Sequence, residues 1–396
     1  MTEWIECTLD KLGEIVGGAT PSTKCEDYYG GSIPWITPKD LSSFKVRYIT
    51  SGERNITEKG LASCSAQMMP KDAVLFTSRA PIGYVAIASQ SVCTNQGFKS
   101  IVVNEKADPL FVYYLLKYNK DAIEAMGSGT TFKEVSGKTM RAVKVRIPLD
   151  VSYQKRIAAV LDSLDTKIEN NERINDNLEQ QAQAIYHERF ETVSPNDLPS
   201  DWRIVTLGEV ATISNKSFNP LKEPEILLEH YSIPAFDEVR FPVFELSTSI
   251  KSNKFIIDAS CFMISKLNPT TKRVWKPYCL TGNAVCSTEF IVYKAKDKTI
   301  TDFLYSVIDS NSFSDFMCSH VTGSTGSRQR TTPSDTLSYE LILPSEDELA
   351  EFQSLVSPMY AQIRINAIEN DRLKRLRDSL LPKLMSGEID VSTIQL

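Results

Sequence analysis

The pattern of hydrophobic and polar positions changes near residue 151, where short β-rich runs give way to one long helical stripe. From Ser152 to Phe190 neither glycine nor proline occurs, and from Leu164 onward the stripe repeats with a strict four, three spacing. That spacing is typical of a coiled-coil seam, and about forty residues of helix extend about 60 Å. The pattern therefore predicts a central spacer helix over residues 151-192.

A second helix with the same seam is predicted over residues 346-396. Its stripe aligns with the first at an offset of 195 residues. Pro358 is predicted to kink or restart this helix and Pro382 to end it, because proline lacks the amide donor and clashes with the preceding turn. Neither helix can bury its stripe alone, so we expect an antiparallel pair. The predicted seam positions are Leu164, Ile168, Asn171, Asn175, Leu178, Ile185, Ile363, Asn366, Asn370, Leu373, Leu376 and Leu380.

Asparagine stands at seam positions where an apolar residue packs better, notably at Asn171 and Asn366. A buried asparagine commonly fixes the register of paired helices at some cost in stability. The alternative is that these positions lie near the helix ends or face solvent.

Outside the two helices, short runs of β-branched and aromatic residues bounded by Gly, Pro or Ser predict strands, as at 73–77 and 84–88. Helical spacing over 108–120 recurs over 301–309. We therefore expect a mixed α/β (α+β) fold, with two globular domains separated by the antiparallel helices. The predicted domains are residues 1-150 and 193-345.

The two domains are predicted to be copies of one unit, because segments of the first recur in the same order in the second. A period of about half the chain is too long for a solenoid repeat. Duplication predicts two similar binding faces. The recurring pairs are Trp4–Leu9 with Trp202–Leu207, Ile33-Pro34 with Ile233-Pro234, Val92-Cys93-Thr94 with Val285-Cys286-Ser287, and Ile147-Pro148 with Leu343-Pro344.

Composition narrows the function classes. Hydrophobic residues make up 42% of the 396 residues, enough for two cores. Met1 to Asp10 lacks a basic flank, and no apolar run approaches the roughly 18 residues that span a bilayer, so we expect a cytoplasmic protein. Eight cysteines without a Cys-x-x-Cys pair, three histidines and no phosphate-loop, dinucleotide or nucleophile-elbow motif predict no metal, no cofactor and no catalytic site in this chain.

The net charge of −6 argues superficially against nucleic acid, because binding DNA requires local positive potential. The negative charge falls on the two helical segments, however, and the two globular parts together are neutral. A neutral domain can still present a basic face.

Runs of glycine, serine and threonine beside cations are the first candidates for such a face. Small hydroxyl residues with free backbone N–H groups suit phosphate contacts, and Arg and Gln can read purine edges. The alternative is a solvent-facing turn. The candidates are Thr130, Thr131, Lys133, Lys138 and Arg141 in the first copy and Ser327, Arg328, Gln329 and Arg330 in the second.

A second pair of candidates closes a hydrophobic strand with a hydroxyl and a cation in each copy. A basic-aromatic loop around Trp275 extends the second of them, and this combination suits a nucleic-acid surface. An ordinary surface loop is the alternative. The residues are Ser78 and Arg79 in the first copy, and Ser265, Lys266, Lys272, Arg273 and Lys276 in the second.

The order of these segments resembles the specificity subunit of type I restriction-modification systems over essentially the whole chain. The second copy departs from the first at Thr288-Glu289, which replaces Asn95-Gln96, so a shared role of that amide pair is not expected. The resemblance also implies that recognition domains diverge with the sequence they read, so base-contacting residues are not carried over from the family. The resemblance rests on Trp4 to Leu12, Ile33-Pro34-Trp35-Ile36, Asp40-Leu41, Thr94-Asn95-Gln96-Gly97, the Gly127-Ser128-Gly129 run, Ile147-Pro148-Leu149, Gln154, Ile157, Leu161, Asp165 and Ile168.

The resemblance implies two target-recognition domains, each reading one half of a bipartite site on double-stranded DNA, with the helices setting the half-site spacing. It implies modification (methyltransferase) subunits docked on the helices and a restriction (translocase/nuclease) subunit in the assembly. S-adenosylmethionine, ATP and Mg²⁺ would belong to those partner subunits. The alternatives are a two-domain protein-interaction scaffold without DNA binding and a nuclease.

Overall fold

The computed structural model describes residues 3–42, 44, 46–129, 133–223, 225–322, 329–392 and 394. The chain forms two compact units. Unit 1 contains Met1–Asn170 and Arg372–Leu396, and unit 2 contains Asn171–Asp371. Each unit therefore combines a globular part with a portion of both long helices.

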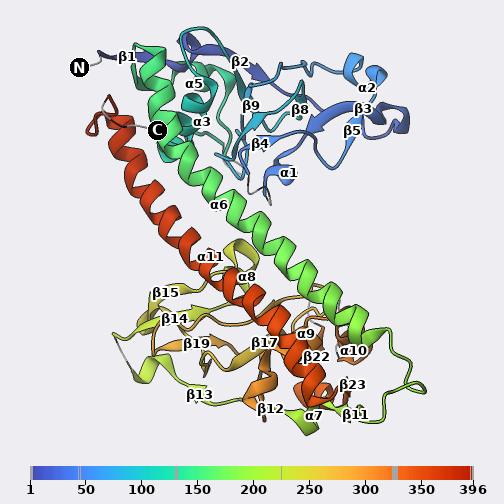
Figure 1. The fold of residues 1–396 in the computed structure, drawn as a ribbon. Helices are drawn as coiled ribbons and strands as arrows, with labels where there is room; N and C mark the ends of the chain where they lie inside the picture. Colours follow the sequence, from blue (N-terminus) through green and yellow to red (C-terminus); the bar gives the residue numbers. More distant parts are fainter. Residues whose placement is uncertain are drawn as a thin grey trace. The chain divides into compact units, whose positions relative to one another are not determined.

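The globular part of unit 1 is mixed α/β, as the sequence predicted (Figure 1). Its elements are β1 (Trp4–Thr8), η1 (Leu9–Lys11), β2 (Gly13–Gly17), η2 (Glu26–Tyr28), β3 (Tyr29–Ile36), α1 (Pro38–Ser42), β4 (Tyr48–Ile49), β5 (Asn55–Ile56), α2 (Glu58–Ala62), β6 (Val74–Phe76), β7 (Val85–Ala88), β8 (Cys93–Thr94), β9 (Lys99–Val103), α3 (Pro109–Tyr118), α4 (Lys120–Ala125), α5 (Gly137–Ala142) and β10 (Lys144–Pro148).

The globular part of unit 2 is mixed α/β as well. Its elements are β11 (Arg203–Thr206), α7 (Leu207–Val210), β12 (Ala211–Ile213), β13 (Ser217–Phe218), η4 (Pro220–Lys222), β14 (Leu227–Tyr231), α8 (Ile233–Val239), β15 (Val243–Leu246), η5 (Ser247–Ser249), β16 (Lys254–Ile256), β17 (Cys261–Ser265), β18 (Val274–Trp275), β19 (Ala284–Ser287), β20 (Phe290–Ala295), η6 (Lys298–Ile300), α9 (Thr301–Ile308), α10 (Asn311–Ser319), β21 (Val321–Thr322), β22 (Arg330–Thr331), η8 (Pro333–Ser338) and β23 (Glu340–Leu343).

The two units repeat one sheet plan, which the sequence did not reveal. The order β2-β9-β6-β7 in unit 1 corresponds to β12-β20-β17-β18 in unit 2. In each unit the first and last strands of the globular part pair antiparallel, β1 with β10 and β11 with β23. A parallel pair also recurs, β3 with β8 and β14 with β19.

The register of that parallel pair corrects one of the predicted recurrences. Trp35 lies opposite Cys93, and Tyr231 lies opposite Cys286, so Trp35 and Tyr231 are equivalent. Ile33-Pro34 lies inside β3, whereas Ile233-Pro234 begins α8. The equivalent of Pro234 is therefore Pro38, the first residue of α1. The two prolines are alike because proline is pre-organised for the first turn of a helix.

The long helices are α6 (Val151–Tyr186), which continues into the π-helical turn His187–Glu191, and α11 (Glu346–Ser386). The predicted restart at Pro358 and the predicted end at Pro382 are wrong, because α11 runs through both residues as one helix, and the predicted kink at Pro358 stays a prediction. The last turn of α11 persists because Leu384 and Met385 are buried in the core of unit 1. Packing there outweighs the hydrogen bond that Pro382 cannot donate.

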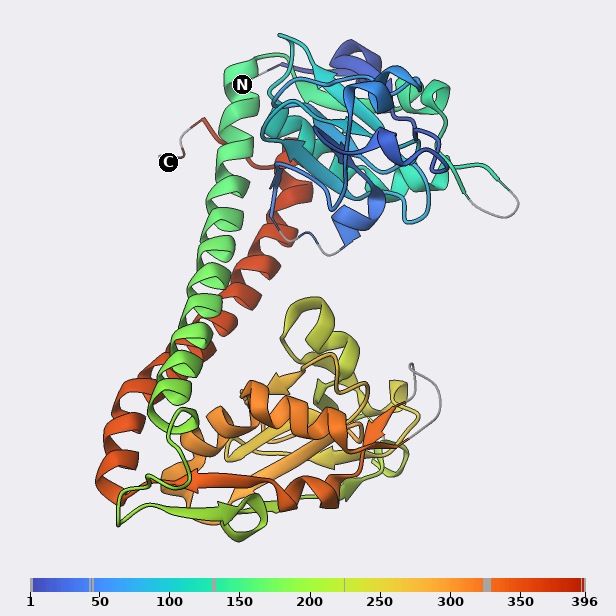
Figure 2. The ribbon, with the colours of Figure 1, turned by 90° about the vertical axis from the view of Figure 1, so that its right-hand side faces the viewer.

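In unit 2 the seam asparagines are hydrogen-bonded between the helices. Asn171 Nδ2 donates to Asn370 Oδ1 at 2.9 Å, and Asn366 Nδ2 donates to Asn175 Oδ1 at 2.8 Å. Residue numbers rise along α6 as they fall along α11, so the two helices are antiparallel here (Figure 2). Asn171, Asn366 and Asn370 are buried, which excludes the alternative of solvent-facing positions.

In unit 1 the paired helices continue with a different polar contact. Asp165 of α6 accepts a hydrogen bond from Arg377 Nη1 of α11 at 2.6 Å and from Tyr114 Oη of α3 at 2.7 Å. Ile168 is buried at the seam as predicted. Leu376 is 46% exposed, so its assignment to the seam is wrong. The remaining predicted seam residues are half-buried: Leu164, Asn175, Leu178, Ile185, Ile363, Leu373 and Leu380.

One buried arginine fixes the strands of unit 1 on α6. Arg47 Nη1 donates to the carbonyl oxygen and to Oδ1 of Asp162, at 2.9 and 2.5 Å. Arg47 Nη2 donates to Thr166 Oγ1 at 2.8 Å and to Glu169 Oε2 at 3.1 Å. Because the guanidinium is planar and its donors are directional, these bonds set the orientation of the domain on the helix.

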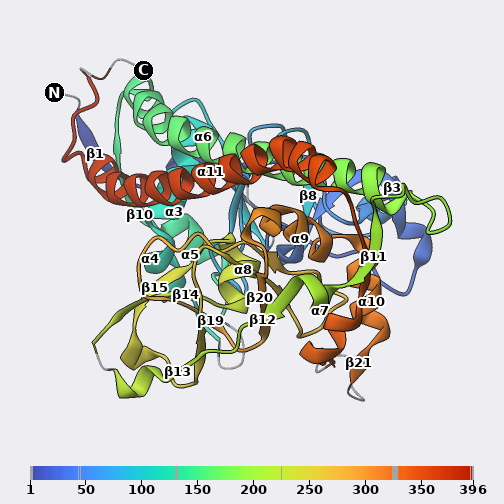
Figure 3. The ribbon, with the colours of Figure 1, turned by 60° about the horizontal axis from the view of Figure 1, so that its bottom comes forward.

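In unit 2 helix α9 joins the globular part to the long helices. It lies against the sheet and against α11, where the hydroxyls of Ser306 and Tyr360 are 2.8 Å apart (Figure 3). Phe303 of α9 packs with Tyr186 at the end of α6, with Phe190 in the π-helical turn and with Phe352 of α11. The helices are therefore part of the core of this unit.

Replacing Asn171 with alanine is expected to lower the free energy of unfolding by about 1–2 kcal/mol, because a buried interhelical hydrogen bond is lost. Calorimetry would show this as a lower unfolding midpoint, by about 2–4 °C per kcal/mol. Asn177→Ala, on the exposed face of the same helix, is the matched control and should cost less than about 0.5 kcal/mol. Equal shifts for the two variants contradict a specific role for the buried pair.

Candidate nucleic-acid interface

The predicted hydroxyl–cation pairs lie at the ends of β6 in unit 1 and β17 in unit 2, and there the backbone of each strand is hydrogen-bonded to two other segments of the chain. In unit 1 the Ser78 amide donates to the Gly97 carbonyl at 2.7 Å, and the Val135 amide donates to the Ser78 carbonyl at 2.8 Å. In unit 2 the Lys266 amide donates to the Glu289 carbonyl at 2.9 Å, and the Thr331 amide donates to the Lys266 carbonyl at 3.1 Å. Ser78 is therefore equivalent to Lys266, not to Ser265.

The two predicted hydroxyls are internal. Ser78 and Ser265 are buried, and their Oγ atoms donate to the carbonyls of Gly97 at 3.2 Å and Leu267 at 3.1 Å. The hydroxyl of each predicted pair is therefore bonded to the backbone where the strand ends, and the charge of the pair belongs to the cation that follows. Lys266 is half-buried.

Unit 1 brings three cations together beside this strand end. Arg79 Nε lies 3.0 Å from Glu134 Oε2, and Lys99 Nζ lies 3.7 Å from Glu134 Oε1. A β-carbon at Gly137 would lie 3.6 Å from Arg141 Nη1 and 3.7 Å from Lys99 Cε, so Arg141 and Lys99 flank the same glycine. We call Arg79, Lys99 and Arg141 the unit 1 basic cluster.

Lys99 was missed by the sequence prediction. Partial burial lowers the pKa of its ammonium group, and the nearby Glu134 carboxylate opposes that shift. The available signal was its place at the start of β9, just after the Asn95-Gln96-Gly97 segment.

The other candidates in the first copy differ in what the structure says of them. Lys133 and Lys138 are exposed, as is Arg141. Thr130 and Thr131 lie outside the described residues. The predicted role of all five in DNA binding stays a prediction.

In unit 2 the equivalent surface is built around Arg330. Its Nε and Nη2 atoms donate to Glu289 Oε2 and Oε1 at 2.9 and 3.1 Å, a two-bond ion pair. The neighbouring Gln329 accepts a hydrogen bond at its carbonyl from the Asn268 amide at 2.9 Å. Ser327 and Arg328 lie outside the described residues.

The predicted basic-aromatic loop is folded into unit 2. Trp275 is buried, and its ring packs 4.7 Å from Tyr231 and 5.3 Å from Phe236 between centroids. Arg273 donates two hydrogen bonds to Asp237, from Nε to Oδ1 at 2.6 Å and from Nη2 to Oδ2 at 2.9 Å. Lys272 donates to the Asp309 carbonyl at 2.6 Å. The aromatic member of the loop is thus a core residue, and two of its cations are internally paired.

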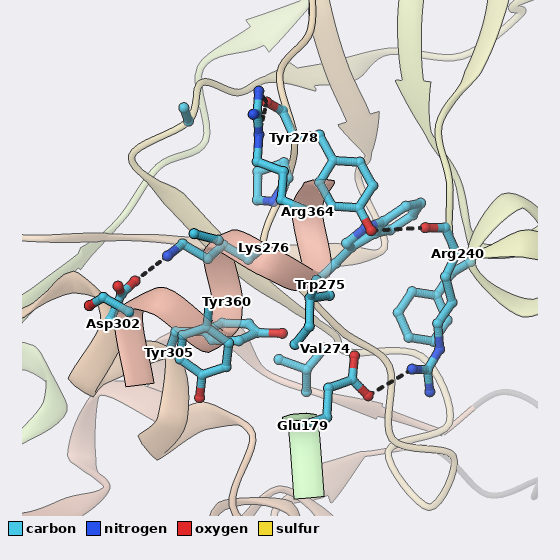
Figure 4. Close-up of a pocket in the computed structure, with 16 residues that line it drawn as sticks. Glu179, Arg240, Val274, Trp275, Lys276, Tyr278, Asp302, Tyr305, Tyr360 and Arg364 are labelled. Carbon is cyan, nitrogen blue, oxygen red and sulfur yellow. Dashed lines mark hydrogen bonds and ion pairs between the residues drawn. The ribbon is translucent and has the colours of Figure 1, made fainter. Parts of the chain in front are cut away.

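Lys276, the third cation of that loop, lines a cavity of about 270 Å³ (Figure 4). It forms an ion pair with Asp302, and its Nζ lies 5.5 Å from the Tyr360 ring centroid. On another side of the cavity, Arg240 Nη1 donates to Glu179 Oε2 at 2.9 Å. These contacts join the loop, α8 and α9 to α6 and α11. The cavity therefore lies where the globular part of unit 2 meets the helices.

Neither a metal site nor a membrane helix is found in the described part of the chain. No group of three or more His, Cys, Asp or Glu side chains there could hold a metal ion. No described helix is long and apolar enough to cross a bilayer.

Two mixed α/β units, each with a basic strand end and a share of two long helices, define a duplicated recognition subunit. A family model for the type I restriction modification DNA specificity domain matches residues 1–180. The type I restriction enzyme MjaIX specificity subunit of Methanocaldococcus jannaschii is 32% identical over 423 residues, which cover 99% of this chain and 95% of that protein. The chain belongs to the family of type I restriction enzyme specificity subunits, as its motifs predicted.

Two more distant proteins are also type I specificity subunits. The EcoR124I/EcoR124II specificity subunit of Escherichia coli is 28% identical over 166 residues, 40% of each chain. The crystal structure of the type I restriction-modification S subunit from M. genitalium has a TM-score of 0.61 at 16% identity and covers 97% of this chain and 96% of that one. That structure shares the fold.

Internally paired and exposed cations should respond differently to neutralisation. Arg273→Gln is expected to cost roughly 1–2 kcal/mol of stability, because a two-bond ion pair with Asp237 is lost and is only partly screened by solvent. Lys138→Gln, which removes the same charge from an exposed side chain, should change stability by less than about 0.5 kcal/mol. Thermal unfolding measures both, and a larger cost for Lys138→Gln contradicts this assignment.

Proposed function

We propose that this chain recognises the DNA target of a type I restriction-modification complex and has no catalytic site of its own. Membership of the specificity-subunit family supports this function. One unit would read each half of a bipartite, asymmetric site on double-stranded DNA. The observation that carries the proposal is that the two units place different cations at equivalent strand ends, Arg79 beside Ser78 and Lys266 in the place of Ser78.

Equivalent backbone positions with different side chains are what two different half-sites require. The common strand ends would bring each unit to the DNA in the same way. Different side chains at those ends would then contact different bases. The exposed Lys133, Lys138 and Arg141 would supply phosphate contacts, and so would Lys266.

The long helices would set the distance between the half-sites. We propose the layout that the sequence predicts, with globular domains over 1-150 and 193-345 separated by an antiparallel coiled coil. The 36 residues of α6 form one continuous helix about 54 Å long. The Asn171–Asn370 and Asn175–Asn366 bonds support a single register of the two helices.

The partners follow from the family. Modification (methyltransferase) subunits would dock on the helices, where Ile174, Ile365 and Leu376 expose apolar side chains. A restriction subunit would join the assembly. S-adenosylmethionine, ATP and Mg²⁺ would be bound by those subunits, and the complex would act in the cytoplasm.

The alternative function is a protein-interaction scaffold that does not bind DNA. The neutral charge of the globular parts is its best support, whereas family membership favours DNA recognition. Methylome sequencing of cells with and without the gene separates the two, because only a specificity subunit changes which DNA motif is methylated.

Lengthening the helices should lengthen the DNA spacer. Duplicating residues 171-177 in α6 and the facing residues 364-370 in α11 adds two helical turns, about 10.5 Å, or up to about three base pairs. We expect methylation of the same two half-sites at a longer spacing. Methylation at the original spacing would exclude the helices as the element that sets it.

Neutralising the exposed cations of unit 1 should weaken DNA binding in a salt-dependent way. For the complex with its methyltransferase subunits, Lys133→Gln, Lys138→Gln and Arg141→Gln together should reduce the slope of log K against log salt by up to about three. The control removes the same charge from other exposed residues of unit 1, Lys59, Lys71 and Lys106, and should leave the slope unchanged. Equal slopes for the two triple variants contradict a phosphate-binding face at 133–141.

A further inference from the structure

The two long helices are equivalent at an offset of 195 residues, and their paired asparagines support this equivalence. Asn171 bonds to Asn370, and Asn366 bonds to Asn175. The offset carries Asn171 onto Asn366 and Asn175 onto Asn370, so each bond is the equivalent of the other. Positions on α6 in unit 1 can therefore be compared directly with positions on α11 in unit 2.

Contacts with the globular parts follow the same equivalence. In unit 1 Tyr114 of α3 donates to Asp165 of α6 at 2.7 Å. In unit 2 the hydroxyls of Ser306 of α9 and Tyr360 of α11 lie 2.8 Å apart, and Tyr360 stands 195 residues after Asp165. Each globular part therefore places one helix against the same position of its long helix.

In unit 1 a buried arginine covers the neighbouring turns of the long helix. Arg47 is 5% exposed and binds Asp162, Thr166 and Glu169 of α6. Its segment runs on into β4, which pairs with β7 at the edge of the sheet. An arginine and the strand that follows it thus close this part of unit 1.

In unit 2 the same place is a cavity. The equivalents of the three α6 residues that bind the arginine are Ser357, Ala361 and Arg364, and all three line the cavity of about 270 Å³. In the described part of unit 2 the sheet ends at β18, the equivalent of β7, with no strand in the place of β4. Arg240, at the end of α8, bonds to Glu179 of α6 instead. The cavity is therefore the counterpart of the arginine site of unit 1.

The charge of the helix face is reversed between the two sites. In unit 1 the arginine lies against the carboxylates of Asp162 and Glu169. In unit 2 the equivalent residues are Ser357 and Arg364, so a hydroxyl and a cation replace the two carboxylates. Because unit 1 fills an acidic site with a cation, a basic site in the same place favours an anion.

Arg364 is the cation of the cavity that lacks a carboxylate. It is exposed, and its Nε and Nη2 atoms donate to the neutral carbonyl of Tyr278 at 3.4 and 3.1 Å (Figure 4). The other two cations of the lining are paired with its two carboxylates. Among the described residues, no carboxylate forms an ion pair with Arg364. The lining therefore has one positive charge in excess.

We propose that the cavity of unit 2 binds a carboxylate group and that Arg364 is the cation that holds it. A charge-assisted bond to a carboxylate is stronger than a bond to a neutral carbonyl. The rings of Trp275, Tyr305 and Tyr360 would pack against the aliphatic part of the ligand. Pockets for small molecules measure about 300–1,000 Å³, so this cavity suits a ligand of about the size of one acidic side chain.

Two sources carry such a group: a free small acid, and an aspartate or glutamate side chain of a partner subunit. Ile365, next to Arg364, is 54% exposed and belongs to the surface where we propose that methyltransferase subunits dock. The chemistry of the cavity is the same for both sources. It does not depend on DNA recognition, so this inference goes beyond the proposed function.

Two probes of opposite charge test the cavity on the purified full chain. Propionate carries the end group of glutamate, and propylguanidinium carries that of arginine. Propionate should bind more tightly, and Arg364→Gln should weaken its binding by roughly tenfold to a hundredfold in a calorimetric titration. Arg203→Gln is the matched control, because it removes the same charge from another exposed residue of unit 2, and it should leave propionate binding unchanged.

A charge-exchange variant separates the chemistry of the site from a general loss of structure. Ser357→Asp and Arg364→Glu together restore the two carboxylates that bind the arginine in unit 1. This variant should bind propylguanidinium more tightly than propionate.

The complex with the methyltransferase subunits distinguishes the two sources. If a partner side chain fills the cavity, the complex should no longer bind propionate, and Arg364→Gln should weaken assembly several-fold whereas Arg203→Gln should not. If the ligand is a free acid, the complex should bind propionate as the chain alone does.

Four results overturn the inference. They are equal binding of the two probes by the unmodified chain, equal losses for Arg364→Gln and Arg203→Gln, a charge-exchange variant that still prefers propionate, and a complex that excludes propionate although Arg364→Gln leaves assembly unchanged. None of these results bears on DNA recognition, which the methylome tests separately.

Discussion

Burial of the apolar stripe of α6 is the constraint on which the rest of the structure depends. A helix of 36 residues with one apolar face cannot hide that face by itself. In unit 1 the stripe packs into a core that contains α3 and the end of α11, and in unit 2 its continuation packs with α9 and the beginning of α11. Each globular part is therefore built around the helices, and helix residues belong to both cores.

Hydrophobic burial has no direction, so polar groups must select one arrangement among several. Apolar stripes alone tolerate a shift of one heptad, whereas the paired asparagines of unit 2 lose their hydrogen bonds if the helices slide. Arg47 does the same for the domain of unit 1, because its bonds to Asp162 and Glu169 exist in one orientation only. These few polar contacts select one arrangement of the helices and the domain among those that apolar packing alone would allow.

Because the backbone is held in this way, surface side chains at equivalent positions can differ between the two units without loss of the fold. The backbone bonds at Ser78 and Lys266 are the same, although one side chain is a buried hydroxyl and the other a cation. Even the sign of the charge is exchanged between Glu134, which bridges Ser128 and Arg79, and Arg330, which bridges Thr322 and Leu267 at the equivalent position. The backbone bonds therefore hold the structure at these positions whichever side chain is present.

The sequence by itself determined the long helices, the mixed α/β class, the duplication and the family. Helical periodicity is a local property, and the family motifs keep their order along the chain, so neither depends on tertiary contacts. Only the tertiary structure decided which cations reach the surface. Arg273 and Lys276 looked as available as Lys138, but Asp237 and Asp302, 36 and 26 positions away, hold them inside unit 2. It also decided that α11 continues past Pro382, because burial of Leu384 and Met385 depends on the core of unit 1. Ion pairing and burial join residues far apart in the chain, and no local pattern records them.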